Sequence, residues 1–323
     1  MSDAAPIPRW RGILKHGLQA AIAIGLLGFL ARRVPLGEAL AALADATPGL
    51  WMLGIGLSAV VLVLGAWRWH LTALRTIPMR TCLAYSWIGH FYSTVLPGAV
   101  VGDVAKAASL ATSDTQHRTM VLPVSVALDR LLGLISLLLV LAVALAAMSG
   151  EKKGLHPAAV AFFSGVVVAV LVLTPQIIRA VLSLARRLRF LPHRVMHALD
   201  RVSFVIGQVG VSSWIFMLVL SVLMHAISGV VFIAAAREFG MHVEAWRLGL
   251  YYVALCIVIM LPVTIAGIGL REQVSLWILG TSSGAAVMPV TLSWFLLVVG
   301  AVHAVIGGLV QLAGWLRAGK RRS

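Results

Sequence analysis

The segment Leu96-Pro97-Gly98-Ala99-Val100-Val101-Gly102-Asp103-Val104-Ala105-Lys106 interrupts a long apolar run. A second interruption follows about 165 residues later, with the sequence Leu261-Pro262-Val263-Thr264-Ile265-Ala266-Gly267-Ile268-Gly269-Leu270-Arg271. Each break contains Leu-Pro, a Gly five residues after the Pro and a cation nine residues after it. Such a repeat at breaks in apolar sequence is typical of internally duplicated membrane transporters. We therefore look for the functional site at these two breaks.

The composition excludes an ordinary soluble domain. Of the 323 residues, 60% are hydrophobic and 11% are charged, and the mean hydropathy is +0.99. A net charge of +15 in a soluble chain would suggest nucleic acid, but here Lys and Arg cluster in short segments between apolar runs. This distribution is typical of membrane topology, and no nucleic-acid partner is expected.

Crossing the bilayer takes about 20 apolar residues. Six runs meet this need, namely residues 14–31, 49–67, 120–147, 157–175, 211–236 and 285–315. Two shorter runs, 81–96 and 248–261, each end at one of the breaks, and broken helices are tolerated at membrane depth where protein or a wet cavity satisfies the backbone. The sequence therefore predicts an all-α, polytopic membrane helix bundle, a single domain over 1–323, with about six full spans and two re-entrant hairpins.

The positive charges predict the orientation of this bundle. Eighteen Lys and Arg residues fall in the segments 1–15, 68–80, 104–119, 176–209 and 316–323, against six in 32–48, 148–156 and 237–247. The positive-inside rule then places both termini in the cytoplasm. The two hairpins enter from opposite sides, so we expect approximate inverted halves, 14–147 and 157–315. The basic segment 176–209 is expected to lie along the inner leaflet.

Charged residues inside apolar sequence are hypotheses for function. Asp103 and Lys106 share a helix face just after Gly102, and Gly98 allows close approach of the backbone. A half-helix that starts at Gly102 would direct free N–H groups and a positive dipole end at an anionic group such as a phosphate.

In the second break, Arg271 supplies a fork of donors for the same kind of ligand, and Glu272 is the matching acid. The alternative is that the charges of the two breaks pair with one another only to hold the hairpins together.

Asp129-Arg130 lies about ten residues into the 120–147 run, roughly 15 Å from its start. Adjacent residues point about 100° apart on a helix, so each is expected to meet a partner on another helix. Expected partners are Lys106 or Arg271 for Asp129, and Asp103 or Glu272 for Arg130. Asp129 and Arg130 could either hold two helices together or contact a ligand, and the sequence leaves both interpretations open.

Other polar residues have simpler interpretations. Trp67-Arg68-Trp69 ends the second run and is typical of an interfacial aromatic anchor with a snorkelling Arg. His225 and His303, each alone in an apolar span, are typical of hydrogen-bonded packing residues. His90, close to the first break, is the better candidate for a proton site.

Three motifs together resemble the lysylphosphatidylglycerol synthase transmembrane-region family of flippase-like membrane proteins. The motifs are Leu96-Pro97-Gly98 with Gly102-Asp103 and Lys106, then Asp129-Arg130-x-x-Gly133, then Leu261-Pro262 with Gly267-Ile268-Gly269-Leu270-Arg271-Glu272. The resemblance implies a bacterial or archaeal cytoplasmic-membrane protein that moves lipids or lipid-linked intermediates between leaflets. The chain departs from the family pattern at Ser93 and Thr94, where Asn is common, at Val101 and Ala266, where a second Gly is common, and at Lys106, where Arg is common. The full synthases carry a soluble aminoacyltransferase domain that this chain is not expected to have.

The sequence thus predicts a lipid flippase-like transporter that shields an anionic or lipid-linked head group in a polar midplane cavity. The predicted substrate-binding or translocation residues are Pro97, Gly98, Gly102, Asp103, Lys106, Asp129, Arg130, Pro262, Thr264, Gly267, Gly269, Arg271 and Glu272. No catalytic residue, metal site or cofactor is predicted, and no G-x-x-x-x-G-K-[ST] motif occurs, so transport is expected to be downhill or ion-coupled. The expected location is the bacterial cytoplasmic membrane, with membrane lipids as partners and a homo-oligomer left open.

Two alternatives to a transporter are kept. One is a membrane-embedded transferase acting on a lipid phosphate, in which Asp103, Asp129 or Glu272 would serve as general base. The other is a non-transporting accessory protein of envelope lipid synthesis.

Overall fold

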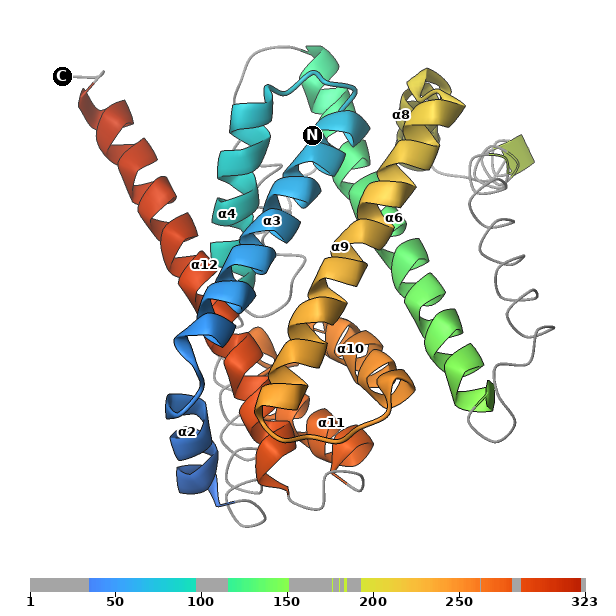
Figure 1. Cartoon of the computed structure of the whole chain (residues 1–323). Helices are drawn as coiled ribbons and strands as arrows, with labels where there is room; N and C mark the ends of the chain where they lie inside the picture. The colour runs from blue at the N-terminus through green and yellow to red at the C-terminus, as the bar shows by residue number, and fades with distance from the viewer. Residues whose placement is uncertain are drawn as a thin grey trace.

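The fold is taken from a computed structural model that describes residues 35–96, 116–150, 176, 180, 183–184, 193–261, 263–280 and 286–320. The elements are α2 Leu36–Ala44, α3 Pro48–Thr72, α4 Met79–Val95, α6 Gln116–Gly150, α8 His193–Gln208, α9 Val211–Glu238, α10 Ala245–Met260, η1 Ile265–Gly267, α11 Leu270–Leu279 and α12 Val287–Lys320 (Figure 1). Within these residues every element is a helix, which confirms the all-α prediction. The predictions for Pro97, Gly98, Gly102, Asp103, Lys106, Pro262 and the runs 14–31 and 157–175 lie outside the described residues.

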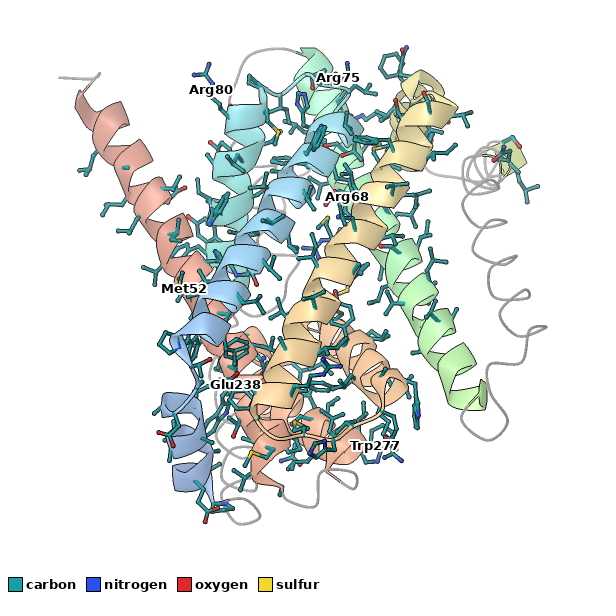
Figure 2. All side chains as sticks on the ribbon, viewed as in Figure 1. Met52, Arg68, Arg75, Arg80, Glu238 and Trp277 are labelled. Carbon is teal, nitrogen blue, oxygen red and sulfur yellow. The ribbon has the colours of Figure 1, made fainter. Side chains whose placement is uncertain are left out.

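Four described helices are long and apolar enough to cross a membrane: α3, α6, α9 and α12. They match four of the six long runs predicted from hydropathy. Large apolar side chains on their outer faces are exposed, such as Met52 at 75%, which points away from the bundle in Figure 2. A helix bundle that is apolar outside as well as inside needs an apolar solvent, so the chain is a polytopic helical membrane protein.

The two short runs form short helices that end in the same way. Helix α4 has 17 residues and α10 has 16, which are at or below the length needed to span a bilayer. Leu96 after α4 (φ −101°, ψ 146°) and Leu261 after α10 (φ −73°, ψ 130°) are both extended. Each precedes a proline, whose ring disfavours helical geometry in the residue before it. The predicted helix ends at both breaks are therefore confirmed, while the re-entrant position in a membrane stays a prediction.

Helices α4 and α10 start from opposite ends of the bundle. Figure 1 shows α4 in the upper half, after the turn that follows α3, and α10 with α11 in the lower half, after the connection that follows α9. The far end of this second hairpin reaches α4, because η1 packs against both α4 and α10. The division into inverted halves 14–147 and 157–315 stays a prediction.

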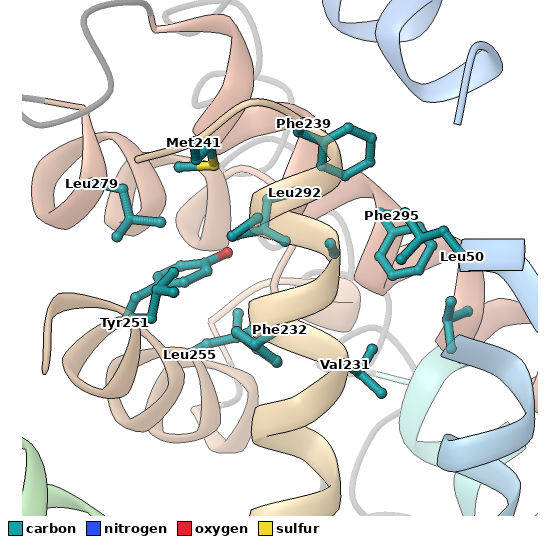
Figure 3. Close-up of a cluster of buried hydrophobic side chains, with 14 of the residues drawn as sticks. Leu50, Val231, Phe232, Phe239, Met241, Tyr251, Leu255, Leu279, Leu292 and Phe295 are labelled. Atoms are coloured by element: carbon teal, nitrogen blue, oxygen red, sulfur yellow. The ribbon is translucent and has the colours of Figure 1, made fainter. Parts of the chain in front are cut away.

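Two kinds of packing hold the bundle together. Aromatic and aliphatic side chains from α3, α9, α10 and α12 fill a core in the lower half, including Phe232, Tyr251 and Phe295 (Figure 3). Helices α4 and α12 instead approach closely through a glycine, since a Cβ on Gly307 would collide with the carbonyl oxygen of Trp87. Helix α6 packs against α3, α9 and α10. Together these contacts place α3, α4, α6, α9 and α10 around a common interior.

Candidate functional site

Two adjoining cavities lie at this common interior. The first, of about 380 Å³, is bordered by α3, α4, α6, α9 and α10, and the second, of about 310 Å³, by α4, α6, α10, η1, α11 and α12. Four described residues border both cavities: His90, Ser93, Arg130 and Ile259. The two spaces therefore meet at a common wall, and charged side chains lie along both.

Arg68 and Asp129 form an ion pair in the wall of the first cavity. Arg68 Nε donates to Asp129 Oδ1 at 2.7 Å, and Arg68 Nη1 donates to Ser221 Oγ at 2.8 Å. Gly133 lies one turn after Asp129 and faces the same guanidinium, since a Cβ on Gly133 would lie in ordinary contact with Arg68 Nη2, at 3.8 Å. The Asp129-x-x-x-Gly133 spacing thus places both residues beside Arg68.

The sequence interpretation of Trp67-Arg68-Trp69 as an interfacial anchor is wrong for two of its three residues. Trp67 is exposed and packs edge-on against Phe216, but Arg68 is only 7% exposed and Trp69 is buried, with its indole N–H donating to Ser125 Oγ at 3.2 Å. Helix α3 continues to Thr72 instead of ending near residue 67, so Arg68 lies inside the bundle (Figure 2). A buried arginine is stable there because Asp129 and Ser221 satisfy it.

Arg130 borders both cavities from α6, next in sequence to Asp129 but on a different face. Of its two expected partners, Asp103 lies outside the described residues, and the carboxylate of Glu272 accepts from the Gly269 N–H and from Ser293 Oγ of α12. Among the described residues, Arg130 is the arginine that lines both cavities.

The second break is a tight chain reversal. Ala266 (φ 51°), Gly267 (φ 74°) and Gly269 (φ 86°) all have left-handed backbones, which glycine adopts without steric cost. Helix α11 then begins at Leu270, and its N-terminus is capped by Glu272, whose Oε2 accepts from the Gly269 N–H at 2.7 Å. The glycines that the sequence singled out are required by this backbone.

Arg271 and Glu272 are joined through Ser293 of α12. Arg271 Nε donates to Ser293 Oγ at 2.9 Å and its Nη2 to Ser293 O at 2.6 Å, while Ser293 Oγ donates to Glu272 Oε1 at 3.2 Å. Arg271 Nε is also 3.8 Å from Glu272 Oε1. This pairing lies within the second break and α12, whereas the charged residues of the first break, Asp103 and Lys106, lie outside the described residues. Because Arg271 also borders the second cavity, a ligand-facing role stays a prediction.

The second cavity lies between the end of α4 and the second break. Ser93 and Thr94, just before the first break, line it from α4, and Ala266 and Arg271 of the second break line it from the other side. A family model of the lysylphosphatidylglycerol synthase TM region matches residues 18–307, which include both breaks and the Asp129-Arg130 motif. The chain belongs to this family. A search of curated proteins found no match.

Membership of the lysylphosphatidylglycerol synthase TM region family makes this a membrane protein related to lipid modification or transport. The family motifs account for Asp129, Gly133, Gly267, Gly269, Arg271 and Glu272. Sequence reasoning missed Arg68 and gave little weight to His225, which lines the first cavity. Ser93 and Thr94 had a signal, because they replace an Asn that is common in the family.

Thr264 is buried, at 2% exposure, but borders neither cavity among the described lining residues. Its hydroxyl has no hydrogen-bond partner within the part of the chain that the structure describes. The predicted translocation role of Thr264 stays a prediction.

Proposed function

We propose that the protein is a flippase-like transporter that moves a lipid or lipid-linked intermediate with an anionic head group across the cytoplasmic membrane. The main support is the pair of adjoining cavities, whose walls hold Arg68, Arg130, Arg271 and Asp129 inside a bundle with an apolar exterior. Among the described residues, three arginines stand against Asp129 and against Glu272, which pairs with Arg271, so one positive charge is in excess. A positive interior favours an anionic head group over a cationic one.

The energetic task of such a transporter is to keep the head group out of hydrocarbon. Moving a bare charge through the bilayer costs several kcal/mol or more. Arg130 and Arg271 would replace part of the lost hydration with charge-assisted hydrogen bonds, which are roughly twice as strong as neutral ones. The acyl or polyprenyl tails would stay in the lipid around the bundle.

The opposed short helices support access from both leaflets. Helix α4 leads to the second cavity from one end of the bundle and α10 from the other, so the site lies between the tips of the two elements. In many carriers such discontinuous helices form a fixed midplane site, and the two repeats alternately open it to each side. We expect both termini in the cytoplasm on the positive-inside rule.

Exchange in liposomes tests this proposal. The purified protein is reconstituted with a trace of fluorescent phosphatidylglycerol, and dithionite added outside reports the fraction of probe in the outer leaflet. We expect complete loss of fluorescence with the wild type and loss of only the outer-leaflet half in empty liposomes. Arg130→Gln should slow exchange at least tenfold, whereas the matched control Arg237→Gln, on an exposed arginine at the end of α9, should not.

The same liposomes separate the alternatives. A new lipid product in the mass spectrum would support the transferase and contradict the proposal. Folded, correctly inserted protein that exchanges neither anionic nor zwitterionic probes would also contradict it and favour an accessory role.

A further inference from the structure

His225 is a titratable side chain at the middle of a membrane span. It lies on α9, which covers Val211–Glu238, about equally far from the two ends, and it lines the first cavity with Arg68 and Asp129. An ionisable group at this depth is expensive, and such groups mark proton and substrate pathways. The mechanism proposed above does not use it.

The hydrogen bonds of His225 accommodate both a neutral and a protonated ring. The hydroxyl of Ser136 donates to the carbonyl oxygens of Leu132 or Gly133, both at 2.9 Å, so Ser136 Oγ accepts at 3.0 Å from His225 Nε2–H. The other ring nitrogen, Nδ1, lies 2.6 Å from the Tyr252 hydroxyl, which can donate to it. A neutral imidazole with its proton on Nε2 satisfies both bonds, and an imidazolium satisfies them too when the Tyr252 oxygen accepts from Nδ1–H.

The charged and titratable groups around His225 come from every helix that borders the first cavity. Among the described residues they are Arg68 of α3, His90 of α4, Asp129 and Arg130 of α6, and Tyr252 and Cys256 of α10. No described residue of α12 lines this cavity. Arg68 and Arg130 line the same cavity, so a proton on His225 would add positive charge near both guanidinium groups. An anionic head group in the cavity would offset that added charge.

We infer that His225 takes up a proton when an anionic head group enters the cavity, and that proton and head group cross the membrane together. The inference deepens the proposed function and rests on it. The proton passes from cavity water to Nδ1, and the Tyr252 hydroxyl turns its hydrogen away so that its oxygen accepts from the new Nδ1–H. The imidazolium then keeps its bond to Ser136 and offsets one negative charge of the head group.

The coupling is reciprocal. If the head group raises the affinity of His225 for a proton, a proton raises the affinity of the cavity for the head group by the same factor. A proton gradient would then drive net lipid movement without a nucleotide. Zwitterionic head groups, which bring no net charge, should show little coupling.

Exchange of fluorescent phosphatidylglycerol is measured from pH 5.5 to 8.5 in the wild type, His225→Gln, Tyr252→Phe and His303→Gln. Glutamine can keep both hydrogen bonds of His225 but cannot be protonated. We expect wild-type exchange to fall about tenfold across this range and His225→Gln to be independent of pH. His303 lines neither cavity among the described residues and donates to Ile55 O at 3.2 Å, so His303→Gln should behave as the wild type.

A second measurement separates failure of the inference from failure of the proposed function. Nitrogen-15 NMR of histidine-labelled protein in nanodiscs follows the titration of His225, assigned by its loss in His225→Gln. Adding phosphatidylglycerol to phosphatidylcholine discs should shift the midpoint upward by about 1 to 2 pH units, as a coupling of 5–150-fold requires. Exchange by His225→Gln with wild-type pH dependence would overturn the inference and leave the transporter standing. If the wild type exchanges no lipid, the proposed function fails, and the NMR midpoint alone decides whether anionic lipid and proton are coupled.

Discussion

Arg68 Nε lies 2.7 Å from Asp129 Oδ1. This ion pair joins α3 to α6, although the two residues are 61 positions apart in the sequence. Replacing Asp129 with Asn would leave the guanidinium largely buried and uncompensated. We expect a loss of about 3 kcal/mol of unfolding free energy, at the lower end for a buried pair because the Asp129 side chain keeps 20% exposure. Thermal unfolding in detergent measures the change.

The double variant Arg68→Met/Asp129→Leu is the control for this pair. With both charges removed, no uncompensated ion remains, and stability should recover most of the loss. If the pair is only a lock between helices, lipid exchange should recover too. A stable double variant without exchange would show that the charges also serve the head group.

Arg271→Lys tests the fork that holds Ser293. The ammonium of lysine cannot reproduce both bonds to Ser293 Oγ and Ser293 O. Loss of one hydrogen bond from a charged donor should lower the free energy of unfolding by about 1.5 to 3 kcal/mol. The matched control is Arg247→Lys, a more exposed arginine beside Glu244, which should change stability by less than about 1 kcal/mol. Equal effects on unfolding temperature would contradict the structural role of the fork.

Gly307→Ala tests the close contact between α4 and α12. The added methyl group would meet the carbonyl oxygen of Trp87, which belongs to helix backbone and cannot move aside cheaply. We expect a loss of about 1 to 3 kcal/mol, the usual range for overpacking. Gly229→Ala on α9 has open space at the Cβ position and should be neutral or stabilising by up to about 1 kcal/mol.

Ala266→Gly should stabilise the protein. The left-handed backbone of Ala266 costs roughly 1 kcal/mol in a residue with a Cβ, and glycine removes this cost. As a control, Ala254→Gly inside α10 should destabilise by about 0.5 to 1 kcal/mol. A lower unfolding temperature for Ala266→Gly would contradict the assigned backbone conformation.

Local patterns predicted the helices well. The apolar runs give the positions of α3, α6, α9 and α12, and the prolines give the ends of α4 and α10, because both signals act on neighbouring residues. The glycines of the second break were predicted for the same reason, since their backbone angles are a local requirement.

Pairing across the bundle was not predictable from the same patterns. Arg68 is flanked by two tryptophans near the end of an apolar run, as an interfacial anchor would be, and only tertiary packing shows that Asp129 and Ser221 face it. Ser293 lies in a largely apolar run, and nothing local indicates that it receives Arg271. Serine is common in membrane helices, so its presence alone has little predictive value.

The wall shared by the two cavities has a consequence for selectivity. Among the described residues, His90, Ser93, Arg130 and Ile259 lie between the Arg68 side and the Arg271 side. In the proposed transport, a head group that moves from one cavity to the other passes these four side chains, so their size limits the cargo. Enlarging Ser93 or trimming Ile259 would then alter which molecules fit while the charges on both sides stay the same.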